Sequence, residues 1–123
     1  TLKEIPHKFL IYFVNVDYDR HMSLIAETRE EGKKRMIGAA SLVMNAEMTS
    51  GELAVFVHDT FQGQGLGTRL VNALLDIARE KSLPEVRAEV LSENTAMLGI
   101  FRRLGFTTRH LPGGSSECLL KLA

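Results

Sequence analysis

The sequence predicts a mixed α/β (α+β) fold, in which one central sheet of antiparallel and parallel strands carries helices on both faces. Two apolar runs with strand character, residues 35–44 and 52–58, are separated by a polar turn and predict an antiparallel pair. Apolar positions then recur at helical spacing over residues 67–81, and an alternating run follows at 85–91. Such a strand–helix–strand unit is parallel and right-handed if its strands pair.

The remaining elements are bounded by turn and capping signals. Pro6 is a helix start signal, and the crowded apolar residues of 6–16 predict a buried helix. The other expected elements are strands at 22–28, 107–112 and 116–122, and a second helix that follows Asn94 and ends at Gly105.

Bulk composition limits the class of function. The chain has 123 residues, enough for one domain, and its 15 Lys and Arg balance its 15 Asp and Glu. No net field therefore attracts nucleic acid or an anionic membrane, and no apolar run approaches the roughly 18–20 residues of a membrane span. The single cysteine, Cys118, fits a reducing cytosol, and the four histidines lack metal-ligand spacing. We expect a cytoplasmic protein without a metal.

Three glycines stand at alternate positions before the expected helix, in the stretch DTFQGQGLGTRL. The first N–H groups of a helix have no partner within it, and the helix dipole attracts negative charge there. Glycines let a phosphate approach this backbone without meeting a β-carbon. The P-loop pattern fails because no Lys-Ser/Thr pair follows, and the dinucleotide pattern fails because its third glycine falls on Thr68 or Leu70.

The spacing does fit Q/R-x-x-G-x-G/A, running from Gln62 to Gly67. This pattern resembles the acetyl-CoA pyrophosphate loop of the GNAT superfamily of N-acetyltransferases. A second segment, SENTAMLGIFRRLGF, resembles the superfamily's N-x-x-A-x-x-x-Y-x-x-x-G-F at Asn94, Gly105 and Phe106. The resemblance implies the acyl-CoA N-acyltransferase fold and an enzyme that uses acetyl-CoA to acetylate an amine.

Three longer segments, DYDRHMSLIAE, GELAVFV and FQGQGLGTRLVNALLDIAREKSL, resemble the acetyltransferase domain of bacterial Pat-type protein lysine acetyltransferases. In many of those the domain is fused to a large acyl-CoA-synthetase-like region. Because the chain opens at Thr1, residues 1–123 are expected to be one GNAT domain from a longer multidomain protein. The first strand and helix usual in the superfamily are expected to be missing. An open sheet edge or helix-packing surface near the N-terminus would then allow a homodimer.

The resemblance implies a cofactor site built largely from backbone. The strand before the glycines is expected to lend its backbone to the pantetheine arm, and Asn94 to bond that arm, to cap its own helix, or both. Phe101 replaces the usual Tyr that protonates the leaving thiolate, so it is expected to pack beside the pantetheine or in the core. The expected cofactor-binding residues are Val55, Phe56, Val57, Gln62, Gly63, Gln64, Gly65, Leu66, Gly67, Thr68, Asn94 and Phe101.

Acetyl transfer also needs a neutral amine. With a lysine pKa of about 10.4, the reactive form costs roughly 4–5 kcal/mol at pH 7, and a nearby base offsets part of that cost. Pat-type enzymes place a catalytic Glu in an AE-x-A context, which Gly51-Glu52-Leu53-Ala54 resembles. The resemblance thus implies Glu52 as general base, the alternative being a solvated glutamate at a strand end.

The expected acceptor is a lysine side chain of a protein, with an acyl-CoA synthetase as one candidate partner. Two alternatives stay open. The chain could be a non-catalytic, acyl-CoA-binding regulatory module, or its acceptor could be a small-molecule or N-terminal amine.

Overall fold

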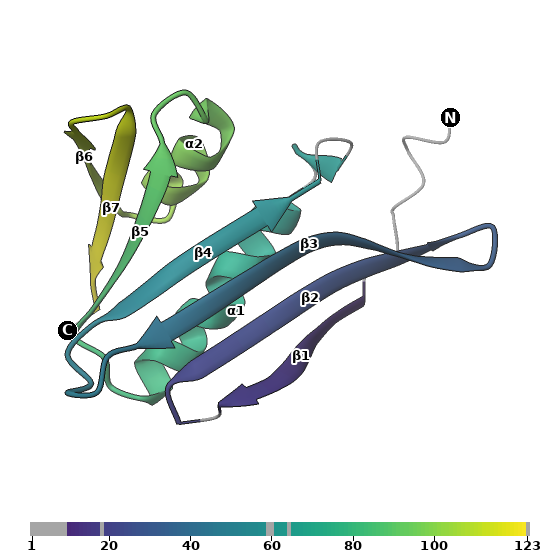
Figure 1. Ribbon diagram of the computed structural model, residues 1–123, viewed down its shortest axis with the longest axis horizontal. Helices are drawn as coiled ribbons and strands as arrows, with labels where there is room; N and C mark the ends of the chain where they lie inside the picture. The colour runs from purple at the N-terminus through teal and green to yellow at the C-terminus, as the bar shows by residue number, and fades with distance from the viewer. Residues whose placement is uncertain (1–9, 18, 59–60, 64, 123) are drawn as a thin grey trace.

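The computed structural model describes residues 10–17, 19–58, 61–63 and 65–122, and Figure 1 shows their path. This described part holds seven strands and two helices. In chain order they are β1 (Leu10–Asp17), β2 (His21–Glu30), β3 (Lys33–Met44), β4 (Gly51–Val57), α1 (Leu66–Glu80), β5 (Glu85–Leu91), α2 (Thr95–Arg103), β6 (Thr107–Leu111) and β7 (Ser115–Lys121). Neither of these helices is long and apolar enough to cross a membrane.

The strands form one sheet in the order β1-β2-β3-β4-β5-β7-β6. Neighbouring strands are antiparallel except β4 and β5, which are parallel and joined through α1. A parallel pair requires a crossover of this kind, because a tight hairpin can only reverse the chain. The predicted mixed sheet, its strand–helix–strand unit, the second helix and the two closing strands are all confirmed.

The prediction of a buried helix at residues 6–16 is wrong, because the chain from Leu10 onward forms strand β1. The run LIYFVNVD is rich in β-branched and aromatic residues, which favour strands, and it pairs antiparallel with β2. The side chains of residues 10–14 are also largely exposed, with Leu10 at 57% and Phe13 at 47%. Residues 6–9 of the predicted helix lie outside the described residues.

The main core lies between α1 and the centre of the sheet. Leu70, Leu74 and Ala78, which form one stripe of α1, are 0% exposed, as are Leu42 of β3 and Val86 of β5. This spacing of three to four residues is the apolar stripe that the sequence predicts for residues 67–81. The stripe fixes α1 across β3 and β4, so the start of α1 is held at the end of β4.

Both described helices lie on the same face of the sheet. A β-carbon on Gly67, at the start of α1, would stand 2.8 Å from Ile100 Cδ1 of α2 and 3.6 Å from Val57 of β4. The expectation of helices on both faces is thus met on one face only within the described residues.

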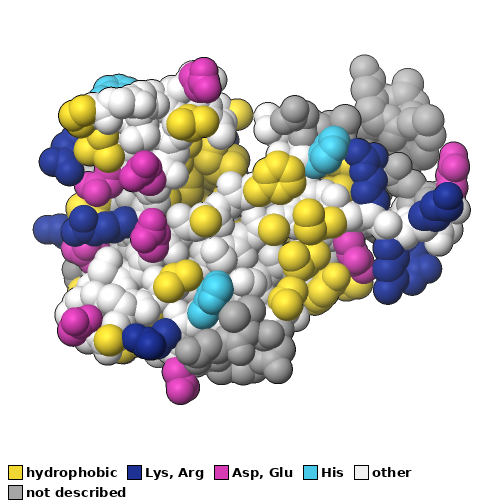
Figure 2. All heavy atoms as spheres, viewed as in Figure 1, with side chains coloured by type: hydrophobic (Ala, Val, Ile, Leu, Met, Phe, Trp, Pro, Cys, Tyr) yellow, Lys and Arg dark blue, Asp and Glu magenta, His cyan; other side chains and the backbone are white. Residues whose placement is uncertain are grey.

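We call the opposite side of the sheet, which carries Glu52, Ala54 and Phe56 of β4 and the residues beside them in register, the open face. Figure 2 shows hydrophobic side chains gathered on it over the central strands. Phe56 is 52% exposed, and Val43, the register partner of Glu52 on β3, is 46% exposed. A partly apolar face that neither described helix covers therefore lies around the residue expected to act as base.

Candidate functional site

The parallel strands β4 and β5 separate partway along their length. They are paired only at Gly51↔Val86, Glu52↔Arg87 and Leu53↔Ala88, and Figure 1 shows them diverging toward α2. β5 therefore pairs with none of residues 54–57. A cavity of about 130 Å³ lies in this split, lined by Leu53, Ala54, Val55, Ala88, Glu89, Val90, Leu91, Asn94, Met97 and Phe101. Extended backbone in such a gap offers N–H and C=O groups to a linear molecule that lies between the strands.

The glycine loop joins the end of β4 to α1. Gly63 and Gly65 have φ angles of 79° and 80°, in the left-handed region, and a β-carbon on either would meet nothing within 4 Å. Gly65 is the N-cap of α1, and no side chain caps the helix there. The first N–H groups of α1 therefore lack a side-chain cap, and the space beside Gly63 and Gly65 is open, which is the arrangement that favours a bound phosphate.

A larger cavity, of about 250 Å³, lies between this loop and α2. Its walls are Val57, Phe61, Gln62, Gly63, Gly65, Gly67, Thr68, Asn94, Thr95, Ala96, Met97, Gly99, Ile100 and Arg103. Asn94 and Met97 line this cavity and also the one in the split. The two cavities are thus neighbours along α2, on either side of Asn94 and Met97, and we refer to the pair as the groove.

Most of the expected cofactor-binding residues line this groove, but they do so in different ways. Val55 lines the split, and Val57, Gln62, Gly63, Gly65, Gly67 and Thr68 line the loop cavity. Leu66 is 1% exposed and belongs to the core, so only its backbone is available. Gln62 donates a hydrogen bond from Nε2 to the carbonyl of Val57 at 3.4 Å. Gln64 lies outside the described residues.

Phe56 points away from the groove, since its side chain is exposed on the open face. Phe101 is 1% exposed and packs edge-on against Phe106, with ring centroids 4.8 Å apart. Its location in the core is thus observed, and because it also lines the split, contact with the pantetheine stays a prediction. Its ring has no proton to donate to a leaving group there.

Asn94 begins α2 and also lines both cavities. Its Oδ1 accepts a hydrogen bond from the Met97 N–H at 3.2 Å, so the capping role expected of it is present. The same hydrogen bond holds the side chain at the place where the two cavities meet. Capping and ligand binding are thus compatible in this position.

The Asn94 cap provides a first testable prediction. Asn94→Ala is expected to lower the free energy of unfolding by about 1 kcal/mol in urea denaturation, because the Met97 N–H loses its acceptor. Asn94→Asp retains the accepting oxygen and should retain the stability. If the Asn94 amide also donates to the pantetheine, the Asp variant will bind CoA more weakly at unchanged stability. Equal stability of wild type and Asn94→Ala would contradict the capping role.

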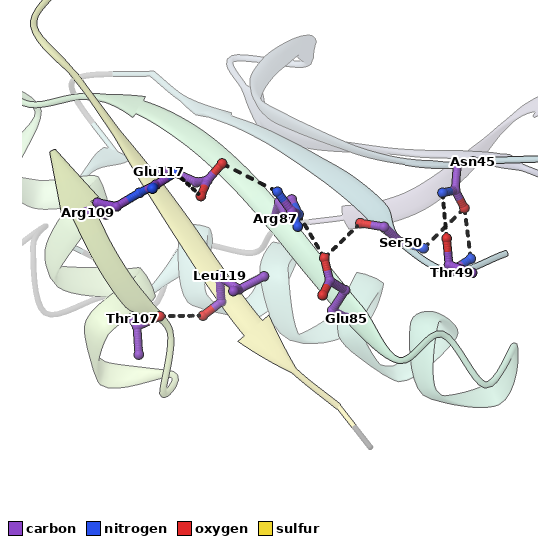
Figure 3. Close-up of polar contacts among 9 residues, drawn as sticks. All are labelled: Asn45, Thr49, Ser50, Glu85, Arg87, Thr107, Arg109, Glu117 and Leu119. Atoms are coloured by element: carbon purple, nitrogen blue, oxygen red, sulfur yellow. Dashed lines mark hydrogen bonds and ion pairs between the residues drawn. The ribbon is translucent and has the colours of Figure 1, made fainter. Parts of the chain in front are cut away.

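Glu52 lies on the open face at the second of the three β4–β5 pairs, one pair before the strands separate. It does not line either cavity of the groove. Its register partner Arg87 forms ion pairs with two other carboxylates, as Figure 3 shows. Arg87 Nε lies 2.8 Å from Glu85 Oε2, and Arg87 Nη1 lies 3.6 Å from Glu117 Oε2. Within the described part of the chain Glu52 makes no ion pair or hydrogen bond, so its carboxylate is available to a ligand from the open face.

Glu89 is a carboxylate that sequence reasoning missed. It is exposed on β5 and lines the cavity in the split, across from Ala54 and Val55. The alternation of apolar and polar residues over 85–91 places Glu89 only on the outer side of a strand. No local signal could show that this strand borders a gap.

The described residues give little support for a cysteine nucleophile or for a metal site. Cys118 is 0% exposed, and burial raises the pKa of its thiol, which disfavours the nucleophilic thiolate at neutral pH. No cluster of His, Cys, Asp and Glu in the described residues could hold a metal ion.

Comparison with known proteins agrees with this geometry. The model of the acetyltransferase (GNAT) family matches residues 3–106. Acetyltransferase PA5475 of Pseudomonas aeruginosa is 29% identical over 99% of this chain and 66% of its own length. Acetyltransferase Pat of Mycolicibacterium smegmatis is 34% identical over 85% of this chain and 31% of its own length. This chain therefore spans less than two thirds of either relative.

Among solved structures, yncA of Salmonella typhimurium, described as a putative acetyltransferase with its cofactor acetyl-CoA, has the same fold. It superposes with a TM-score of 0.72 at 21% identity, and the match covers 94% of this chain and 95% of that one. The family match covers most of the chain and includes the glycine loop, the β4–β5 split and the start of α2. The chain therefore belongs to the GNAT family of acetyltransferases.

Proposed function

We propose that this chain is an acetyl-CoA-dependent N-acetyltransferase and that its acceptor is a lysine side chain of a protein. The observation that carries the proposal is the pair of adjacent cavities, one at a glycine-built helix start without a side-chain cap and the other in the split between β4 and β5. CoA has an anionic end and a long neutral arm, and the groove offers unpaired N–H groups to the first and strand backbone to the second.

In this proposal the pyrophosphate of CoA lies against the backbone of Gly63, Gly65 and Gly67, with Thr68 beside it. The pantetheine arm then passes Asn94 and enters the split, where the backbone of residues 55–57 is not used by β5. The thioester would thus reach the region where β4 and β5 part. That position is adjacent to the open face, from which an acceptor can approach.

The chemical step is attack of a neutral amine on the thioester carbonyl. The Glu52 carboxylate takes one proton from the lysine ammonium, directly or through one water, which matters because the free amine costs roughly 4–5 kcal/mol at pH 7. The new N–C bond then forms, the C–S bond breaks, and the second proton that the nitrogen loses passes to solvent. The leaving thiolate takes a proton from solvent, because the Phe101 ring cannot supply one.

A protein acceptor is supported by the resemblance to Pat-type enzymes and by the shape of the open face. Glu52 is exposed there, and a shallow cavity of about 280 Å³ lies beside it, lined by residues of β2, β3 and β4. A broad face that neither α1 nor α2 covers suits a side chain presented on a protein surface. A cytoplasmic location and a homodimer through the β1 edge also remain proposals.

The test is mass spectrometry of acetylated products. The chain, or a longer protein that contains it, is incubated with acetyl-CoA and purified acyl-CoA synthetases, and separately with small amines and peptides that have free N-termini. We expect acetyl-lysine on at least one synthetase, above the level produced by a Glu52→Gln control. Transfer only to small or N-terminal amines would show that the acceptor is an amine of that class and not a protein lysine. CoA binding without transfer to any amine would favour a non-catalytic, acyl-CoA-binding module.

A further inference from the structure

Arg103 lies at one end of the loop cavity. Ala96, Gly99 and Arg103 follow one another along a single face of α2, and all three line this cavity. Among the described residues of that lining, Arg103 alone is charged. Within the described residues it makes no ion pair or hydrogen bond, so no carboxylate there neutralises its guanidinium.

The absence of a side chain at Gly99 accounts for the position of the Arg103 guanidinium. A β-carbon at Gly99 would stand 3.3 Å from Arg103 Nη1, so the Arg103 side chain folds back along α2 over the bare glycine. Side chains on a helix lean toward its N-terminus and meet the residue four positions earlier. Glycine is a poor helix former, and at this position the absence of its side chain leaves room for a cation in the cavity wall.

The position of Arg103 along the groove identifies the group it can reach. α1 begins beside Ile100, where a β-carbon on Gly67 would touch Cδ1 at 2.8 Å. Arg103 is one helical turn beyond Ile100 and nine residues from Asn94, about 13 Å along the helix axis. It therefore lies farther along α2 from the β4–β5 split than the Ile100–Gly67 contact does, which in the proposed donor placement is the side of the adenosine end of CoA.

We propose that Arg103 binds the 3′-phosphate of CoA and makes the chain select CoA over 3′-dephospho-CoA. The 3′-phosphate is the remaining anionic group once the pyrophosphate occupies the glycine loop. A guanidinium can donate two parallel hydrogen bonds to one phosphate, which makes this pair strong and specific. The inference rests on the donor placement in the proposed function.

The experiment is titration calorimetry with CoA and with 3′-dephospho-CoA. Arg103→Gln should weaken CoA binding about tenfold and change 3′-dephospho-CoA binding by less than about twofold. Arg102→Gln is the matched control: it removes the same charge from the adjacent residue, but Arg102 hydrogen-bonds Thr108 Oγ1 of β6 and does not line the cavity. It should leave both affinities unchanged.

Two more variants keep the test independent of folding. Arg103→Lys should retain part of the preference for CoA, because the charge remains while the two-pronged geometry is lost. Gly99→Ala should reduce the preference a few-fold by displacing the guanidinium. Equal loss for both ligands in Arg103→Gln, or no loss for either, would overturn the assignment. A wild-type chain that bound neither ligand would instead refute the donor placement.

Discussion

Glu52→Gln is expected to lower kcat/KM for acetyl transfer by about 100- to 1,000-fold at pH 7 while leaving the affinity for CoA unchanged. Gln has nearly the same shape but cannot accept the proton that the attacking amine must lose. The fold should not change, because Glu52 is exposed and has no ion pair or hydrogen bond in the described part of the chain. CoA affinity should persist because Glu52 lines neither cavity of the groove. Steady-state kinetics and calorimetry measure the two quantities separately.

The dependence of this defect on pH makes the test sharper. As pH rises toward the lysine pKa of about 10.4, more of the acceptor amine is already neutral and less depends on a base. The ratio of wild-type to Glu52→Gln rate should therefore shrink with increasing pH. A defect of constant size from pH 7 to pH 9 would point to a structural role of Glu52 instead.

Glu89→Gln is the matched control for Glu52→Gln. Both substitutions remove one exposed carboxylate from the open face, and Glu89 stands on the other strand of the split. We expect only a small change in kcat/KM for Glu89→Gln. If Glu89→Gln produced the large defect and Glu52→Gln did not, the base would have to be reassigned to Glu89.

Gly65→Val is expected to weaken CoA binding by at least about 100-fold, through two effects. A branched side chain would fill the open space in front of the first N–H groups of α1, which a phosphate must occupy. The φ of 80° at Gly65 also lies in a region that β-branched residues avoid, so the loop itself would be displaced. Calorimetry with CoA measures the loss, and Gly65→Ala should show a smaller one.

Gly32 provides the control for backbone strain. It has a φ of 77°, no atom lies within 4 Å of its β-carbon position, and it sits in the turn between β2 and β3, outside the groove. Gly32→Val should lower the thermal midpoint much as Gly65→Val does, yet retain CoA affinity. Retained CoA binding in Gly65→Val, within a few-fold of wild type, would contradict the phosphate position.

The features that the sequence predicts well are those set by neighbouring residues. The glycine spacing and the stripe of Leu70, Leu74 and Ala78 are local patterns, and the loop and α1 have the expected form. The error at residues 6–16 has the opposite origin. A short apolar run fits a buried helix and a strand equally well, and pairing with β2, which is distant in sequence, decides for the strand.

The site residues that sequence reasoning missed depend on packing between distant elements. Glu89 is significant only because β4 and β5 separate after Leu53 and Ala88, where Met97 and Phe101 of α2 line the split. The sequence alone does not distinguish the roles of Arg102 and Arg103, because both are arginines at the end of the same helix. The orientation of α2 against α1 turns one toward Thr108 and the other toward the cavity.

The most direct test of the account is an experimental structure of the chain with bound acetyl-CoA. We expect the pyrophosphate within hydrogen-bond distance of the backbone N–H groups at the start of α1, and the pantetheine arm between β4 and β5 beside Asn94. The thioester should end where the two strands part, next to the open face. Acetyl-CoA bound elsewhere, or a pantetheine arm that lies outside the β4–β5 split, would contradict the proposed mechanism.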